Sequence, residues 1–567
     1  MLSKRARPNQ DQEVPKDKRL RYNVADLCLS SGISASRCQS VYEDAQACGA
    51  RNVGDLARIG NQGKSKGNCS RDLLRKLVKG SEWPAPYYAP VRVWSAKKQK
   101  EEVEMLPILL PHELVRVLHQ NADHPERLLS QENLGAESRR NLARAAQEIK
   151  AHPGQLIGLG LWGDGVPCNW DRSQSIECFT MSLPGIDGEW ENMRMPIWAT
   201  NKKFLVRHNT FDDVLTVVTW SLRCLAIGVM PSKRHDLSAW LPTDRLRSRQ
   251  AKTPLPVKAV LCEVRGDWAF MKQCFRLPQS NEIKGCCWRC RVTPDEIRDA
   301  SAGAPWRKQR LDHWDLIKRI HEDNANCSPL MGAPGLRSQC FAMDWLHVAD
   351  LGITCNFLGG LFKLLLRKME GRNESDRCSQ LFLRMQQFYK ENKTESRLDN
   401  LTLSMLRADQ AKKGPKLRAK GAEARGLVPF AAELADQLLR DDDEEERAAK
   451  LAARALHACY QNLSTAVYDA ARMAHHSRTF ALLQVALETH AEQHNSLNWY
   501  VKPKLHMFQE MCEFGSTRPA TCWTYRDEDF GGSVASYAWR RGGALTAVSV
   551  SSMVLMKFRA KHNVPHI

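Results

Sequence analysis

Four short apolar runs and one longer apolar segment, all between residues 156 and 264, constrain the fold most. In chain order the runs are LIGLGLW (156–162), SIECFTMSL (175–183), MRMPIWAT (193–200) and PLPVKAVLCEV (254–264). Turn signals separate them, as expected for strands. The segment before the fourth run, FDDVLTVVTWSLRCLAIGVM (211–230), is predicted to be an apolar helix. The order strand–strand–strand–helix–strand predicts an open sheet whose first and fourth strands lie side by side.

Acidic residues follow two of these runs. Asp164 ends the first strand and Asp267 ends the fourth. The strand order is that of the ribonuclease H-like fold, in which both carboxylates would face one cleft. A third carboxylate, Glu528, lies in CWTYRDEDFGG (522–532), near an expected helix start. Magnesium prefers oxygen ligands, and two ions about 3.5–4 Å apart can activate an attacking oxygen and stabilise a leaving one. The pattern predicts a site for two Mg²⁺ or Mn²⁺ ions.

Each of these acids also has a simpler interpretation. The Asp–Gly pair at Asp164 is typical of turns, and Asp267 could cap the end of its strand. Glu528 has acidic neighbours, Asp527 and Asp529, and the local pattern alone does not choose among the three.

Strand signals nearly vanish between about 300 and 500, where helical periodicity predominates. This segment separates the second and third acids by far more chain than an ordinary loop. We therefore expect an α/β protein: a ribonuclease H-like catalytic domain, interrupted by a large all-α insertion and preceded by a small helical domain. The expected parts are a disordered basic leader (1–22), a helical domain with a helix–turn–helix pattern (23–80), a linker with helices (81–151), the first part of the core (152–295), the all-helical insertion (296–500) and the last part of the core with Glu528 (501–567).

The charge balance favours a polyanionic partner. The formal net charge is +19 and the isoelectric point is near 9.2, which points most simply to nucleic acid. Lys4, Arg5 and Arg7 of the leader are candidate DNA contacts, and the leader itself is either a nuclear-import signal or a solvated tail. Ser34 is a candidate N-cap for the second helix of the helix–turn–helix pattern, which equally suits a small helical bundle.

Cysteines and apolar segments favour an intracellular protein that does not enter a membrane. The 19 cysteines lack a framework spacing, and the N-terminus has no apolar signal segment. The longest apolar stretch (353–366) is interrupted by Asn356 and Lys363, and it is shorter than the ~18 apolar residues that a membrane span needs. We expect reduced thiols and a nuclear location.

A Cys-x-x-Cys pair, Cys287 and Cys290, forms half of a zinc site. His347 in DWLH is the expected third ligand, and Asp344 or another Cys or His would complete the site. Such a Zn²⁺ ion would be structural and would clamp the helical insertion to the sheet, whereas the alternative is two core thiols near a turn. His506 in KPKLHMF could contact DNA phosphate, orient the active site or simply pack in the core.

The ordered set of motifs resembles the DDE-type DNA transposases of the CACTA (En/Spm) group, and more distantly the hAT and Mutator-like groups. The motifs are LGLWGDGVPCNWDRSQSIECFTMSLPG, VRGDWAF, GCCWRC, MDWLHVADLGI, KPKLHMFQEM and CWTYRDE. They span about 155–535, and several flanking positions depart from the plant versions.

The resemblance implies that Asp164, Asp267 and Glu528 are the metal ligands of an Asp–Asp–Glu triad. Two Mg²⁺ or Mn²⁺ ions would support hydrolysis at a transposon end, followed by attack of the freed 3′-hydroxyl on target DNA. Transposases of this kind pair two DNA ends, so a homo-oligomer on DNA is expected.

Three functions remain open at this point: an active transposase, a domesticated or decayed relative that binds DNA without cutting it, and a zinc-stabilised helical scaffold for protein partners. The presence of all three acids favours the first, and the charge of +19 argues against the third. Convergence of the three carboxylates in space would separate a catalytic site from three unrelated acids.

Overall fold

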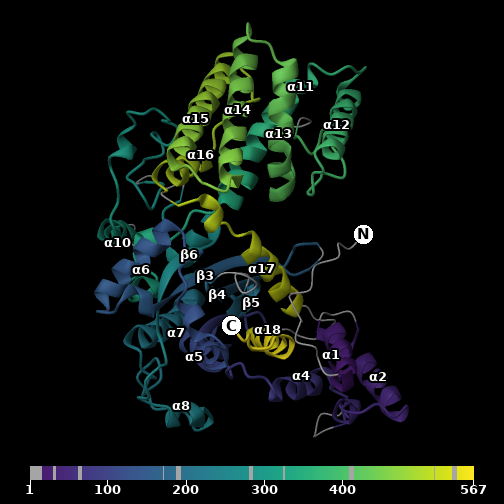
Figure 1. The fold of residues 1–567 in the computed structure, drawn as a ribbon, viewed down its shortest axis with the longest axis vertical. Helices are drawn as coiled ribbons and strands as arrows, with labels where there is room; N and C mark the ends of the chain where they lie inside the picture. Colours follow the sequence, from purple (N-terminus) through teal and green to yellow (C-terminus); the bar gives the residue numbers. More distant parts are fainter. Residues whose placement is uncertain are drawn as a thin grey trace.

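The computed structural model describes residues 16–29, 33–61, 67–169, 171–186, 193–279, 285–322, 326–407, 414–515, 517–538 and 546–567. The protein is a mixed α/β structure in which a small sheet is surrounded by many helices (Figure 1). The candidate DNA contacts Lys4, Arg5 and Arg7 lie outside the described residues.

The four predicted strands form one mixed sheet. They are β3 (Leu156–Pro167), β4 (Ser175–Ser182), β5 (Arg194–Asn201) and β6 (Lys258–Arg265). Their order across the sheet is β5-β4-β3-β6, with β4 antiparallel to both neighbours and β6 parallel to β3. The predicted placement of the first and fourth strands side by side is therefore confirmed.

Helices cover both faces of this sheet. They include α5 (Pro111–Asn121), α6 (Ala136–Glu148), α7 (Arg207–Ile227), α9 (Trp268–Phe275), α17 (Tyr525–Ala538) and α18 (Ala547–Lys561). The short helix α8 (Arg245–Arg249) lies away from the sheet, at the bottom of Figure 1. On one face Gly531 of α17 lies against Trp162 of β3. On the other face Phe179 of β4 packs against aromatic rings of α7 and α9. Gly163 makes this packing fit, since a Cβ there would lie 2.3 Å from the Phe270 ring.

The N-terminal part differs from the prediction in two places. Its elements are α1 (Lys16–Leu29), α2 (Ala35–Ala47), α3 (Gly54–Ala57), α4 (Cys69–Lys79) and an antiparallel hairpin of β1 (Tyr87–Ser95) and β2 (Lys100–Ile108). Helix α1 begins at Lys16, inside the leader (1–22) expected to be disordered. The hairpin lies where a linker was expected; alternate side chains of β1 are buried, a pattern that Pro90 obscures. Ser34 caps α2 as predicted and accepts the Arg37 N–H at 3.1 Å.

Helices fill the segment from 296 to 500, as its periodicity predicted. They are α10 (His313–Glu322), η9 (Leu346–Thr354), α11 (Cys355–Leu366), α12 (Glu374–Glu391), α13 (Gly421–Leu438), α14 (Glu444–Ser464) and α15 (Ala470–Gln493), and α16 (Lys504–Gln509) follows. No strand occurs among the described residues of this segment. Helices α11–α16 stack beyond one end of the sheet, in the upper half of Figure 1, and are called the helical block below.

The most apolar helix lies inside the helical block. The element η9 is wound as a π-helix and runs directly into α11. Together, as Leu346–Leu366, they are long and apolar enough to cross a membrane, but 83% of their most apolar window is buried within the protein. This is the environment of a core helix.

A buried ion-pair network holds α17 against the sheet. Asp527 of α17 is fully buried and accepts the Nε–H of Arg194 on β5 at 2.6 Å. Arg265 on β6 lies 3.4 Å from the other oxygen of Asp527 and also pairs with Glu263. The network fixes which face of α17 meets the sheet, and so fixes where the neighbouring residue, Glu528, points.

We predict that Asp527→Asn lowers the free energy of unfolding by about 3–5 kcal/mol, because it leaves the buried Arg194 without its carboxylate. Chemical denaturation would measure the change. Asp529→Asn is the matched control: the same substitution in the same helix at an exposed residue should change stability by no more than about 0.5 kcal/mol. Equal effects of the two substitutions would contradict the role given to the network.

Candidate metal sites

Two of the predicted acids meet at one edge of the sheet. In the parallel pair β3–β6, Trp162 is in register with Arg265, and Asp164 and Asp267 each follow two residues later. The strands remain close there, since a Cβ on Gly266 would lie 2.8 Å from the Gly163 carbonyl oxygen. Burial and the charge of Asp267 both raise the pKa of Asp164. The two carboxylates therefore share one electrostatic environment.

Asp267 also caps a helix. It is the N-cap of α9, and its side chain accepts the Phe270 N–H at 2.6 Å. The simpler interpretation was a cap at the end of the strand, and the structure shows instead a cap at the start of the helix that follows. Only the Oδ1 atom is the acceptor of this hydrogen bond, and a cap that uses one oxygen leaves the other for a cation.

The third acid reaches the same place from α17. Side-chain ligand atoms of Asp164, Glu528 and His347 all lie within 4.8 Å of one another. Burial, followed by the charge of Asp164, raises the pKa of Glu528 to about 8. The structure also separates Glu528 from its acidic neighbours, because Asp527 is locked against Arg194 and Asp529 is exposed.

His347 and Asp344 require a correction. Both were expected beside Cys287 and Cys290. The structure places them instead beside Asp164, Asp267 and Glu528, which are called the carboxylate cluster below. The Nε2 atom of His347 lies 3.8 Å from Oε1 of Glu528, and its Nδ1 atom lies 2.6 Å from Oδ2 of Asp344. The reason is that η9 packs beneath the start of α17 and carries the Asp-x-x-His motif there.

Asp344 joins the two elements. It accepts the backbone N–H of His347 at 3.1 Å and, across the interface, the N–H and hydroxyl of Thr524 at 3.0 and 2.8 Å. Burial acts to lower the pKa of His347, but the Asp344 carboxylate outweighs it, with help from Glu528 and Asp267, and raises the pKa to about 9. The imidazolium thus partly offsets the crowded carboxylates.

The donor set of this cluster fits a divalent cation. Carboxylate oxygens suit Mg²⁺ and Mn²⁺, and an imidazole is compatible with Mn²⁺. Glu528 Oε1 is buried and has no hydrogen-bond partner among the described residues, as expected of an atom that awaits a cation. A carboxylate–histidine pair such as Asp344–His347 is also the usual support of a metal-facing imidazole.

The sequence analysis missed a fourth acid, Glu177. It lies on β4 with only 1% of its surface exposed. Burial, together with the charges of Asp164 and Asp267 and against that of Lys202, raises its pKa to about 7. Its position inside a buried strand run was a signal, because a carboxylate is rarely buried there, and Lys202 pairs with it only at 3.8 Å.

A second cluster brings Cys287 and Cys290 together with two residues near α16. Their partners are His506 and Glu510, and one ligand atom from each of the four lies within 4.8 Å of the others. The Cys290 sulfur lies 3.3 Å from His506 Nε2, which lies 3.7 Å from Glu510 Oε1. His506 is 1% exposed, so of the possibilities given for it the packed histidine is confirmed and contact with DNA phosphate is wrong. The missed signal was the spacing of His506 and Glu510, which places both on one helical face.

The chemistry of this second cluster fits zinc. Two thiols, one imidazole and one carboxylate match the ligands of tetrahedral Zn²⁺. Burial acts to raise the pKa of Cys287, but hydrogen bonds with Cys290 and His506 outweigh it and lower the pKa. Arg310 donates to both oxygens of Glu510 at 2.7 Å and orients it, as an outer partner of a ligand does.

A buried hydrogen-bond network links the carboxylate cluster to the helical block. Asp350 of η9 accepts the hydroxyl of Tyr525, in the first turn of α17, at 2.6 Å. It also accepts the hydroxyl of Tyr460 on α14 at 2.5 Å and the indole N–H of Trp345 at 3.1 Å. Burial raises the pKa of Asp350 to about 7, although these donors oppose the shift.

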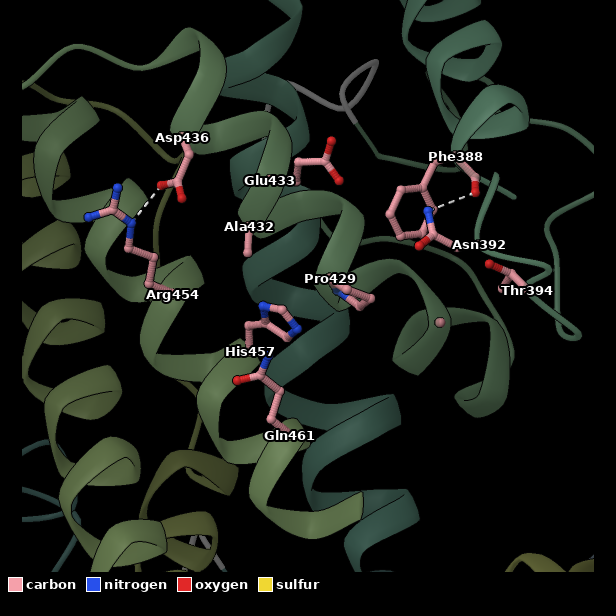
Figure 2. Close-up of a pocket in the computed structure, with 11 residues that line it drawn as sticks. Phe388, Asn392, Thr394, Pro429, Ala432, Glu433, Asp436, Arg454, His457 and Gln461 are labelled. Carbon is pink, nitrogen blue, oxygen red and sulfur yellow. Dashed lines mark hydrogen bonds and ion pairs between the residues drawn. The ribbon is translucent and has the colours of Figure 1, made fainter. Parts of the chain in front are cut away.

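A polar groove lies apart from both clusters. It has a volume of about 780 Å³ and is formed by α12, α13 and α14 (Figure 2). Glu433, Asp436, Arg454 and His457 line it, and Arg454 donates to Asp436 at 2.6 Å. No residue of the two metal-ligand clusters lines this groove.

Comparison with models of known protein families and with curated proteins returns no match to this chain. The family resemblance therefore rests on the sequence motifs, and the chemistry of the site rests on its own geometry.

We predict that the purified protein contains about one Zn²⁺ ion per chain. Cys290→Ser and His506→Ala should each remove it and lower the melting temperature, because each deletes one ligand of the second cluster. Elemental analysis would measure zinc content, and thermal unfolding would measure stability. Cys286→Ser is the control, since Cys286 is adjacent in sequence but outside the cluster. Zinc content that survives loss of Cys290 would contradict the assignment.

We also predict a pH dependence of stability from Asp350. Its folded pKa of about 7 exceeds the ordinary 3.8, so the folded state binds its proton more tightly than the unfolded chain does. The resulting stability is fully present below the ordinary value and is lost as the pH rises through about 7.

Melting temperatures of the wild type and Asp350→Asn, measured across this range, would test the prediction. The fall with rising pH should be smaller in the variant. Glu177 titrates in the same range in both proteins, so the difference between the two curves is the quantity to compare. Identical slopes would contradict the prediction.

Proposed function

We propose that this chain is a metal-dependent DNA transposase of the DDE type, acting through Asp164, Asp267 and Glu528. One observation carries the proposal: Asp164 and Glu528, far apart in sequence, converge with His347 within 4.8 Å, and Asp267 lies beside Asp164. Three unrelated surface acids would not gather in this way, because like charges repel. Such a cluster is most easily explained by a cation that compensates it.

The fold supports the same proposal. The sheet order β5-β4-β3-β6, with β6 parallel to β3, agrees with the order expected for a ribonuclease H-like core, which we propose for this sheet. The helices between β6 and α17 would then be the all-α insertion, and α17 the last part of the core. The net charge of +19 suits a DNA-binding protein, which we propose to be nuclear and to act as a homo-oligomer on two transposon ends and a target.

Asp164, Asp267 and Glu528 would hold the ions in the proposed mechanism. Two Mg²⁺ or Mn²⁺ ions bound there would activate the attacking oxygen and stabilise the leaving one, in hydrolysis and then in strand transfer. Asp344 holds Nδ1 of His347, so that Nε2 faces the acids. From there His347 can donate to a phosphate oxygen or ligate an ion as a neutral imidazole. The protein supplies position and charge, and no covalent nucleophile is needed.

We also propose a structural zinc site, with His506 and Glu510 in place of the expected His347 and Asp344. Cys287, Cys290, His506 and Glu510 would bind a structural Zn²⁺ ion, which joins the loop after α9 to α16. The ion would thereby fasten the catalytic sheet to the helical block, as the Cys-x-x-Cys motif led us to expect.

We predict that Asp164→Asn and Glu528→Gln abolish Mg²⁺- or Mn²⁺-dependent nicking and strand transfer while leaving DNA affinity within about threefold, because each removes a metal ligand. The assay would use DNA with the ends that flank the gene. Asp171→Asn and Asp529→Asn are controls, since Asp171 is exposed in the loop that follows β3 and Asp529 is exposed on α17.

Two outcomes would decide against the catalytic proposal. Full cleavage by Asp164→Asn would show that the activity lies elsewhere. Binding of the same DNA by wild type and variant, with no cleavage by either, would instead identify a domesticated relative that binds without cutting.

A further inference from the structure

A lysine with no carboxylate partner in the described part of the chain touches the candidate active site. Lys504, at the start of α16, donates its ammonium to the carbonyl oxygen of His347 at 2.7 Å. Its aliphatic stem packs on Gly352 of η9, where a Cβ would lie 2.9 Å from Lys504 Cδ. The ammonium is therefore held beside the acids rather than being free to turn toward bulk water.

Three more cations lie in the same region: the charge of Lys416 acts on the pKa of Lys504, and the charges of Arg407 and Lys502 act on the pKa of Lys416. Two backbone hydrogen bonds position the segment that carries Lys416. The Lys416 N–H donates to the Leu406 carbonyl oxygen at 3.0 Å, and the Leu417 N–H donates to that of Cys355 at 2.8 Å. The first contact brings Lys416 beside Arg407. We call Arg407, Lys416, Lys502 and Lys504 the cation row.

Lys502 joins the row through an aromatic ring. Its ammonium lies 4.6 Å from the centroid of the Tyr500 ring, and the same ring packs on Gly414, two residues before Lys416. Lys502 is exposed, Lys416 is partly buried and Lys504 is largely buried. The row therefore leads from solvent to the carboxylate cluster.

No member of the cation row has a carboxylate within ion-pair distance among the described residues, whereas many other cations of the chain do. The Nε–H of Arg407 is buried and has no hydrogen-bond partner among the residues that the structure describes. Burial and the neighbouring cations lower the pKa of both Lys416 and Lys504, although the acids near Lys504 act in the opposite direction. Cations crowded in this way are stabilised by an anion that lies among them.

We propose that the cation row binds the phosphodiester backbone of the DNA strand that enters the carboxylate cluster. A polyanionic backbone matches a line of point charges, and it delivers one phosphate to the acids while others rest on the row. The inference rests on the proposed function, since it names how that site receives its strand. Lys504 would contact the phosphate nearest the acids, and Lys416 and Lys502 would contact phosphates farther along the strand.

The test is the salt dependence of binding to a short, fluorescently labelled DNA duplex of mixed sequence, without divalent cations. Lys416→Gln/Lys502→Gln should lower the slope of log affinity against log salt by about 2, and the affinity at low salt by about 10–100-fold. Lys318→Gln/Lys390→Gln is the matched control, because it removes the same charge from exposed lysines of α10 and α12. The control should leave the slope unchanged.

Equal slopes for the wild type and the Lys416/Lys502 variant would overturn the proposal. Equal losses of DNA affinity in the variant and its control would also overturn it. If that variant unfolds, Lys502→Gln alone serves, since Lys502 is exposed; its slope should fall by about 1. Failure here is distinguishable from failure of the proposed function. If the wild type cleaves DNA but the slope of the Lys416/Lys502 variant is unchanged, only the proposed role of the cation row is wrong. If the slope falls but the wild type never cleaves DNA, only the proposed catalysis is wrong.

Discussion

The hydrogen bonds to Asp344 are the contacts on which the candidate active site depends. This carboxylate lies between η9 and the start of α17 and accepts from both, through His347 and Thr524. It settles which ring nitrogen of His347 faces the acids, and it sets where α17 begins and hence where Glu528 lies. A neutral side chain could satisfy some of these donors, but only a carboxylate also holds the imidazole charged among other acids.

Local patterns could identify only part of this site. Asp164 and Asp267 were predictable because strand ends can be read from apolar runs a few residues long. The choice between Asp527 and Glu528 was not, because it depends on which face of α17 meets the sheet. That face is set by Arg194, which lies on a strand hundreds of residues earlier. The sequence resemblance selected Glu528, and the structure supplies the physical reason that its neighbour is unsuitable.

The fold shows the same division between local and distant information. The order of elements from 156 to 264 and the helices after 296 follow from periodicity, which each segment carries by itself. The hairpin of residues 87–108 was missed because Pro90 and a charged turn interrupt its alternation. The partners of Cys287 and Cys290 were misassigned because the candidate histidines, His347 of η9 and His506 of α16, both lie in largely buried helices. Only tertiary packing decides which of those helices meets the cysteine loop.

The distribution of the three clustered ligands along the chain bears on how the protein is made. Asp164, His347 and Glu528 leave the ribosome in that order, with most of the helical block emerging between the first and the last. The residues of the sheet, 156–265, are therefore synthesised before the helix that completes the cluster. A polypeptide that ends early lacks α17 altogether. Under the proposed function this order has a consequence, because interrupted translation would then yield fragments that are unable to cut the genome of the cell that makes them.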